Sequence, residues 1–341
     1  MVARTSRAKR TTLRDVADLA GVSVATASKA LNGRADVHED TRRRVIQAAE
    51  TLSFAANTLA QQLVRGKTGT VGLITNDLEG RFSIPILMGA EDAFGAGRMS
   101  VLLCDARGDS IRESYHLQAL LKRQVDGLII VGSRTDPRPS LGHELPVPVV
   151  YVYAPSSDPS DLSVTPDNVG AGRLAAEHLI TLGRRRIAHI AGDPSYAAAR
   201  DRAVGVDEAL ENARLELVQD RPMFGTWSEA WGRSATRTLL AESPGFDGLI
   251  CASDQIARGA LDMLREEGVL VPQDVAVVSF DNWKILATGS RPQLTSVDMG
   301  FEQIGELAAR RLVAALDGEL GSGIVAHPCH LVVRGSTVPD A

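Results

Sequence analysis

The sequence predicts a small all-α unit followed by a larger α/β core made of two parallel-sheet subdomains. Its length of 341 residues suits two or three domains. Near the N-terminus, residues 12–32 read as two short helices joined by a tight turn. From residue 70 onward, apolar runs of strand length alternate with helical patterns, which is typical of parallel sheets covered on both faces. Residues 125–133 and 246–254 echo each other, which indicates two similar subdomains.

The first helical pattern begins at Thr12, whose side chain is placed to cap the helix together with Asp15 three residues later. Its apolar face is expected to consist of Val16, Ala17, Leu19 and Ala20. Gly21 supplies the turn that follows, where a side chain would crowd the approach of the next helix.

A second helix is predicted after Ser23, which is placed to cap it. Its exposed face carries small and polar residues: Val24, Ala25, Thr26, Ser28 and Lys29. Such a face lets a helix sink between phosphates and reach base edges in the major groove of DNA. The pair is therefore predicted to be a helix-turn-helix, and the alternative is an ordinary helical hairpin.

A third helix is predicted over residues 39–53, with Val45, Ile46, Ala49 and Leu52 facing inward. Because His38 is a poor cap, Asp36 is expected to cap this helix instead. Asn57 is placed to cap a brief helix over residues 58–65, which a glycine at position 66 ends. The first eleven residues are predicted to be a disordered basic arm.

The core is predicted to alternate strands and helices. The expected strands are residues 71–75, 127–131, 147–152, 186–191, 248–252 and 275–280. The expected helices are residues 86–96, 113–123, 170–181, 202–212, 228–241, 255–268 and 301–316.

Charge is distributed unevenly along the chain. Residues 1–67 contain 12 Lys and Arg against 6 Asp and Glu, a net charge of +6. The remainder contains 25 basic and 36 acidic residues, a net charge of −11. A basic head on an acidic body fits phosphate binding by the head, although a solvated charged surface also gives such totals.

The cysteines and histidines of the sequence predict neither a disulfide framework nor a metal site. Cys104, Cys251 and Cys329 are odd in number and far apart, which predicts reduced thiols in a cytoplasmic protein. His327 and His330 are close in sequence but lack further ligands, so a strand end is predicted and no metal site. No apolar run approaches the length of a membrane span, and no apolar stretch follows the basic N-terminus as in a secretory signal.

Polar residues follow the predicted strands, at the sheet edge where ligands bind in open α/β folds. These residues are Asn76 and Asp77, Ser133, Asp193, Ser253 and Asp254, and Asp281 and Asn282. Together with Arg202 and the aromatic residues Phe82, Trp227 and Trp283, they suit a polyhydroxylated small molecule. The alternative for each Asp or Ser alone is a helix cap or a turn.

Motifs typical of enzymes are missing from the sequence. There is no dinucleotide fingerprint after a strand, no phosphate loop of the Walker type, no nucleophile elbow and no zinc-protease helix. The sequence therefore predicts a protein that is not an enzyme.

These elements together resemble the LacI (lactose-repressor, LacI/GalR) family of bacterial transcription regulators over nearly the whole chain. The resemblance is carried by the head segments 15–17, 20–26, 31–32, 41–42, 44–45 and 48–49, by the hinge segment 57–63, and by residues 253–255, 280–281 and 331–337 of the core. It implies a periplasmic-binding-protein-like core that dimerises and binds a small effector in its cleft. Since no leucine heptad follows residue 337, a dimer is expected over a tetramer.

The resemblance also implies roles for individual residues. Val24, Ala25 and Lys29 would face bases, Ser23, Thr26, Ser28 and Asn32 would hold phosphates, and Leu63 would wedge into the minor groove. Thr12 and Asn57 complete the expected DNA-binding set. The expected effector-binding set is Asp77, Phe82, Ser133, Arg202, Trp227, Asp254, Asp281 and Trp283.

The implied domains are a helix-turn-helix domain at 12–56, a hinge helix and linker at 57–69, and an effector-binding and dimerisation core at 70–341. Within the core, the N-subdomain is expected at 70–168 and 298–327, and the C-subdomain at 169–297 and 328–341.

Three single positions and one segment depart from the family pattern. Lys29 stands where arginine is commonest, Ala56 replaces the proline before the hinge asparagine, and Ser253 replaces an asparagine. Residues 80–83, Gly-Arg-Phe-Ser, replace Asn-Pro-Phe-Phe, which weakens the case for Phe82 as an effector contact.

The prediction is a homodimeric repressor in the cytoplasm. It binds double-stranded operator DNA, uses no cofactor, and is switched by a small effector, a sugar or a sugar derivative. The alternative is a solute-binding protein of transport or sensing, which would need a signal peptide and no basic head. An enzyme with a fused DNA-binding head, and activation of some promoters instead of repression, are further alternatives.

Overall fold

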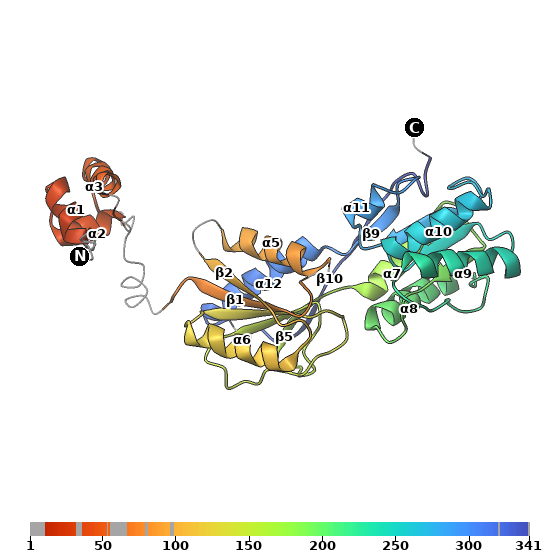
Figure 1. The fold of residues 1–341 in the computed structure, drawn as a ribbon, viewed down its shortest axis with the longest axis horizontal. Helices are drawn as coiled ribbons and strands as arrows, with labels where there is room; N and C mark the ends of the chain where they lie inside the picture. The colour runs from red at the N-terminus through yellow and green to blue at the C-terminus, as the bar shows by residue number, and fades with distance from the viewer. Residues whose placement is uncertain are drawn as a thin grey trace, which may run out of the picture. The chain divides into compact units, whose positions relative to one another are not determined.

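The computed structural model describes residues 11–31, 36–52, 54, 67–78, 81–95, 99–319 and 321–339. The chain forms two compact units, Met1–Thr68 and Gly69–Ala341 (Figure 1). The predicted brief helix at 58–65 and the residues Asn32, Asn57 and Leu63 lie outside the described residues.

The head is a three-helix unit, made of α1 (Leu13–Ala20), α2 (Val24–Leu31) and α3 (Glu39–Thr51). The predicted capping box is confirmed, because Asp15 N donates to Thr12 Oγ1 at 3.3 Å and Thr12 N donates to Asp15 Oδ2 at 2.7 Å. Gly21 has the left-handed conformation the turn requires, with φ 66°. The hydroxyl of Ser23 accepts from Thr26 N at 3.1 Å, so Ser23 caps α2 as predicted.

Three expectations about the head were wrong. Leu19 and Ile46 were placed on the apolar faces, yet they are 54% and 42% exposed, and the core is completed by Ala27, Val37 and Ala48 instead. His38, and not Asp36, caps α3, with Asp40 N donating to His38 Nδ1 at 3.4 Å. The Asp36 carboxylate pairs with Lys29 instead.

The first sheet of the core has six strands, all parallel, in the order β10-β5-β4-β3-β1-β2. Its strands are β1 (Thr70–Thr75), β2 (Ser100–Asp105), β3 (Gly127–Val131), β4 (Val149–Val152), β5 (Leu162–Pro166) and β10 (Gly323–His327). Its helices are α5 (Ser83–Phe94), α6 (Ser110–Lys122) and α12 (Phe301–Leu316). Helices α5 and α12 cover one face and α6 covers the other; sheet and helices together are called the first lobe (Figure 1).

The second sheet has five strands in the order β11-β9-β8-β7-β6. Its strands are β6 (Ile187–Ile190), β7 (Gly248–Cys251), β8 (Ala276–Phe280), β9 (Thr295–Asp298) and β11 (His330–Val332), and only β11 runs antiparallel among them. Helices α7 (Asn168–Thr181) and α8 (Ala197–Asn212) cover one face, and α9 (Glu229–Glu242) and α10 (Asp254–Glu266) the other. With the short α11 (Lys284–Ala287), these elements form the second lobe.

The structure confirms the six strands and seven helices predicted for the core, with ends that shift by a few residues. Strands β2, β5, β9, β10 and β11 were not predicted. His327 and His330 lie at strand ends, as expected. The three cysteines form no disulfide.

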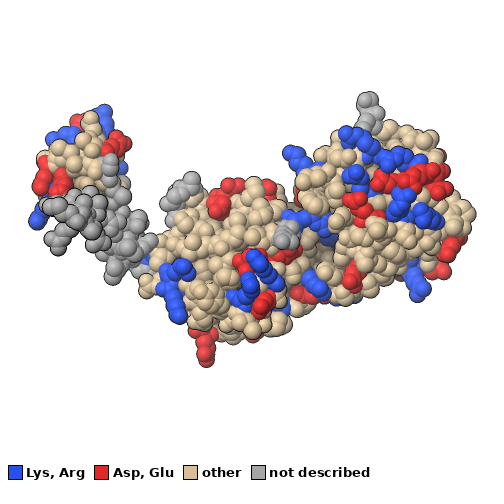
Figure 2. All heavy atoms as spheres, viewed as in Figure 1, with Lys and Arg blue, Asp and Glu red and all other residues tan. Residues whose placement is uncertain are grey.

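The surface of the second lobe carries charges of both signs. On the face drawn in Figure 2, acidic and basic side chains lie interspersed over this lobe.

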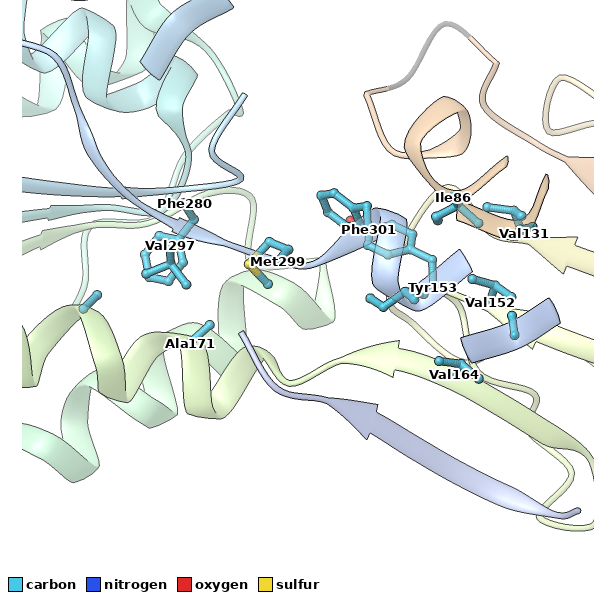
Figure 3. Packing of buried hydrophobic residues seen from close by; sticks show 14 of the residues in the cluster. Ile86, Val131, Val152, Tyr153, Val164, Ala171, Phe280, Val297, Met299 and Phe301 are labelled. Atoms are coloured by element: carbon cyan, nitrogen blue, oxygen red, sulfur yellow. The ribbon is translucent and has the colours of Figure 1, made fainter. Parts of the chain in front are cut away.

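The chain passes between the two lobes three times: between β5 and α7, between β9 and α12, and between β10 and β11. A single cluster of buried apolar residues runs through this region (Figure 3). Val297 and Phe280 lie on its second-lobe side, Phe301 and Tyr153 on its first-lobe side, and Met299 lies between them. The lobes are therefore joined by core packing as well as by the chain.

Candidate effector site and DNA-reading helix

Helix α2 presents the predicted DNA-reading side chains at the surface of the head. Ser23, Val24, Ala25 and Lys29 are exposed, while Ala27 and Ala30 on the same helix are buried against α1 and α3. This pattern leaves one face of α2 unpacked within the described part of the head. Thr26 and Ser28 are half-buried at its margin.

Lys29 is already paired in the head alone. Its Nζ lies 2.6 Å from Asp36 Oδ2, and both side chains are more than half exposed. An exposed pair of this kind contributes little to stability, so the lysine can exchange Asp36 for an acceptor on DNA. Thr12, by contrast, uses its hydroxyl within the capping box.

The second lobe carries a sharp turn directly after β8, at Asp281 and Asn282. Both residues have positive φ, at 92° and 46°, which non-glycine residues adopt at a cost of about 1–3 kcal/mol each. Four hydrogen bonds hold the turn: from Asp281 N to Val297 O, from Asn282 N to Ser296 Oγ, from Asn282 Nδ2 to Asp298 Oδ2 and from Arg334 Nη2 to Asn282 Oδ1. The turn directs the Asp281 carboxylate toward α8.

Arg202 on α8 is the fixed partner of Asp281. Its Nη2 donates to Asp281 Oδ1 at 3.3 Å, its Nε to Asn168 Oδ1 at 3.0 Å and its Nη1 to Ala252 O at 2.5 Å. Only 3% of its side chain is exposed. Every guanidinium nitrogen is thus engaged, and the carboxylate is held in one orientation.

Close packing of α7 and α8 places Arg202. A Cβ on Gly205 would lie 1.9 Å from Val169 O, and a Cβ on Gly172 would lie 2.1 Å from Arg202 O. The two glycines therefore let the helix backbones touch at the level of the arginine.

The structure places Asp254 differently from its predicted role as an effector contact. The residue is fully buried, and it accepts from Ser279 Oγ at 2.5 Å, Ser296 Oγ at 2.8 Å and Trp283 N at 2.6 Å. Burial, reinforced by the nearby Asp281 carboxylate, raises the pKa of Asp254 to about 7. In this conformation Asp254 fixes the turn that carries Asp281 and has no surface left for a ligand.

The first lobe reaches the same turn through Arg81 and Phe82. Arg81 Nη1 donates to Asp281 Oδ2 at 3.2 Å, and the Arg81 guanidinium lies 5.0 Å from the ring centroid of Trp283. Phe82 packs against Tyr153 and Phe301, with ring centroids 4.8 and 4.7 Å apart. Phe82 is therefore engaged in core packing and is not an open platform, in line with the departure of residues 80–83 from the family pattern.

Ser133 and Trp227 lie apart from this cluster, since no hydrogen bond or ring contact within the described residues joins them to Asp281. Ser133 lines a pocket of about 450 Å³ in the first lobe, beside the ion pair of Glu113 and Arg138. Trp227 packs on Tyr196, and its indole N–H is buried without a hydrogen-bond partner in the described structure. Asp77 is half-buried at the end of β1, where its backbone is bonded to Thr75 and Ser83.

A second contact crosses between the lobes at the start of α8. Both Asp136 carboxylate oxygens accept from Ala197 N at 3.1 Å, and Arg200 Nη2 donates to Asp136 Oδ1 at 3.1 Å. Arg134 lies 4.2 Å from the centroid of the Tyr196 ring. Sequence reasoning missed both Asp136 and Arg81. Only Arg81 left a signal, as a charged residue at the position where the family pattern has proline.

Neither a membrane span nor a metal site occurs among the described residues. None of the helices there combines the length and apolarity needed to cross a membrane. In the same part of the chain, no group of three or more His, Cys, Asp or Glu side chains is arranged to hold a metal ion.

Comparison with known proteins assigns both units. The model of bacterial regulatory proteins of the lacI family matches residues 12–57, and the periplasmic binding protein-like domain matches residues 176–337. The HTH-type transcriptional regulator CelR of Thermobifida fusca is 36% identical over 97% of this chain and 99% of its own. The chain belongs to the LacI family of bacterial transcriptional regulators.

Other LacI-family members extend the same match. The transcriptional regulator RegA of Clostridium saccharobutylicum is 32% identical over 96% of this chain and 99% of its own length. Among solved structures, the lac repressor dimer bound to operator and the anti-inducer ONPF is 28% identical, with a TM-score of 0.75 over 96% of this chain and 99% of that chain. The complex of CelR with cellobiose is 32% identical, with a TM-score of 0.64 over 96% of this chain and all of that chain.

These matches confirm the predicted fold class, a helix-turn-helix head with two parallel-sheet α/β subdomains as in the lac repressor. They also confirm a DNA-binding transcriptional regulator with an effector-binding core. Membership of a family of regulators agrees with the prediction that the chain is not an enzyme.

Proposed function

We propose that this LacI-family member is a homodimeric repressor acting in the cytoplasm, and that a sugar or sugar derivative bound at Asp281 switches its affinity for operator DNA. The observation that carries the proposal is the buried pair of Arg202 and Asp281 at the carboxyl end of the second sheet. A carboxylate fixed in this way beside Trp283 presents acceptors to hydroxyl groups and an aromatic ring to the apolar face of a sugar. The related CelR was solved with cellobiose, which supports this class of ligand.

We propose that α2 reads the operator. Val24, Ala25 and Lys29 would contact bases from the exposed face, and Ser23, Thr26 and Ser28 would hold phosphates. Thr12 completes the DNA-binding set in this part of the head. Asn32, Asn57 and Leu63 keep their predicted roles, with Leu63 as the wedge in the minor groove.

A second copy of the chain would bind the first lobe along α5 and β2. The exposed residues there include Ile84 and Met88 on α5 and Leu102 and Leu103 on β2, each between 36% and 50% exposed. Strand β2 is also an edge strand of the sheet. Exposed apolar side chains beside a free edge are typical of a surface covered by a partner.

The switch would act through the geometry of the dimer. The predicted brief helix at 58–65 is too short to be stable alone in water, so its order depends on what it packs against. An effector that changes how the two lobes of each subunit are held would alter the distance between the two copies of residues 58–65 in the dimer. It can shift operator affinity by no more than its differential affinity for the two states.

The test is an operator titration with the full-length dimer. An operator is first selected from random duplexes, and a panel of neutral sugars, sugar acids and sugar phosphates is then screened for release or tightening of the complex. The ligand that acts should lose its effect in Asp281→Asn, while Asp262→Asn, on the solvent side of α10, should respond as the wild type does.

Two results would overturn the proposal. If no duplex is selected over random DNA while sugars still bind, the protein is a solute-binding protein without DNA regulation. If a ligand acts equally on the wild type and on Asp281→Asn, the effector binds elsewhere.

A further inference from the structure

In this structure the effector site proposed above is filled by a side chain of the protein itself. The Arg81 guanidinium comes from the first lobe and donates to Asp281 Oδ2, on the second lobe, at 3.2 Å. It lies 5.0 Å from the centroid of the Trp283 ring and 5.3 Å from that of Phe82. A guanidinium against a carboxylate and between two aromatic rings is a favourable arrangement for a cation.

The two arginines on Asp281 are bound very differently. Arg202 uses all three guanidinium nitrogens and is 3% exposed. Arg81 uses one nitrogen and is 19% exposed, and Asp281 is its single acceptor within the described part of the chain. Asp281 is therefore neutralised by Arg202 whether or not Arg81 is present, and Arg81 is the partner that can leave.

We propose that Arg81 is a latch that holds the two lobes together in the free protein and competes with the effector for Asp281. A ligand that hydrogen-bonds Asp281 Oδ2 must replace the guanidinium there. The affinity of the ligand is then set by how much more favourable its contact with Asp281 is than the contact of Arg81 with Asp281. When the ligand binds, the hydrogen bond between the lobes is lost and is replaced by hydrogen bonds to the ligand. The competition rests on the proposed function, whereas the latch is a property of the protein without ligand or DNA.

The other contact between the lobes provides a control. Asp136 binds the start of α8 and makes no hydrogen bond to Asp281 or Arg81 within the described residues. Loss of Asp136 should loosen the lobes at α8 and leave the Asp281 turn as it is.

The first experiment is amide hydrogen exchange on the full-length protein without DNA or effector. In Arg81→Ala, exchange over residues 281–288 and at the start of α5 should rise about tenfold. Arg81→Lys should give a smaller rise, because an ammonium keeps the charge but cannot stack as a planar guanidinium does. Asp136→Asn should raise exchange at residues 197–200 and leave residues 281–288 unchanged.

The second experiment is chemical rescue. Guanidinium chloride at a low, non-denaturing concentration should restore protection of residues 281–288 in Arg81→Ala, because the ion can enter the space between the two rings. Equal sodium chloride should not, and Arg81→Ala combined with Asp281→Asn should not be rescued. A wild-type exchange pattern in Arg81→Ala, or equal effects of the two salts, would overturn the latch.

These outcomes are independent of the operator titration. A latch found in a protein that binds no operator would refute the repressor role alone. Operator control by a ligand, with no change in exchange in Arg81→Ala, would refute the latch alone.

Discussion

At the scale of single residues, the turn at Asp281 illustrates how a strained backbone is kept in place. Its two positive φ angles are unfavourable for residues with a Cβ, and they persist because strand β9, Arg334 and Asp254 all bind the turn. These contacts fix the orientation of the Asp281 carboxylate in the protein without ligand. A pre-organised acceptor costs a ligand less to bind than one that must first be ordered.

Asp254 should make stability depend on pH. Its pKa is about 7 in the folded protein and near 3.8 without burial, so between these values the folded state holds more protons than the unfolded state. The stability it contributes is therefore complete below about pH 3.8 and is lost as pH rises toward 7. Urea unfolding should be measured between pH 5 and 7. The free energy of unfolding should fall with rising pH more steeply in the wild type than in Asp254→Asn, by up to about 1.4 kcal/mol per pH unit.

The control for Asp254 is Asp262→Asn on the same helix, which should keep the slope of the wild type. Parallel slopes in the wild type and Asp254→Asn would show that Asp254 remains ionised across this range.

Lys29 is the residue whose removal should separate specific from general DNA binding. Lys29→Ala should cost about 1–3 kcal/mol on the selected operator and much less on random duplex, measured by titration at fixed salt. Asp36→Asn should strengthen binding to both, because it releases the lysine from its 2.6 Å pair. Equal losses on both duplexes in Lys29→Ala would make the lysine a phosphate contact only.

At the scale of elements, the contact between α7 and α8 is the support of the site. Gly205→Ala would place a Cβ 1.9 Å from Val169 O, so the helices must separate and carry Arg202 with them. We expect a loss of about 1–3 kcal/mol in urea unfolding. Val204→Ala, at an exposed position on the same helix, should stay within about 0.5 kcal/mol of the wild type. A Gly205→Ala protein as stable as this control would contradict the packing.

The elements show what the sequence could predict and what it could not. The predicted core strands are mostly apolar runs buried on both faces of a sheet; in β3, for example, every residue is buried. Such runs can be recognised from the sequence alone. Strand β2 also carries an apolar run, residues 101–104, but it lies at an edge of the sheet and none of its residues is buried, so the run was not recognised as a strand. Helix α8 begins at Ala197, five residues before the predicted start. The N–H of Ala197 has no partner within the helix and donates instead to Asp136, which lies 61 positions away in the sequence and caps the helix there.

The same limit applies to the site. Arg202 and Asp281 could be named because each stands in a local motif, and the structure brings them to 3.3 Å. Arg81 and Asp281 are separated by 200 residues and meet only because the two lobes meet. No local pattern of residues encodes that contact.

At the scale of the whole molecule, self-association should depend on the first lobe. Met88→Asp, on the exposed face of α5, should convert a dimer into a monomer, as measured by analytical ultracentrifugation. Leu270→Asp, at an exposed apolar position in the second lobe, should leave the dimer intact. Dissociation in Leu270→Asp alone would place the interface on the other lobe.

The chain passes between the lobes three times, and this connectivity determines which parts of the protein can fold first during synthesis. Both sheets take a strand from beyond residue 322, β10 in the first and β11 in the second. During translation, neither lobe can complete its sheet until that stretch has left the ribosome, whereas the three helices of the head are synthesised within the first 51 residues. A chain that stops between β9 and β10 therefore contains the three helices of the head but lacks one strand of each sheet. In such a chain β5 and β9 each lack their neighbour at the edge of the sheet, and exposed strand edges favour pairing with other chains.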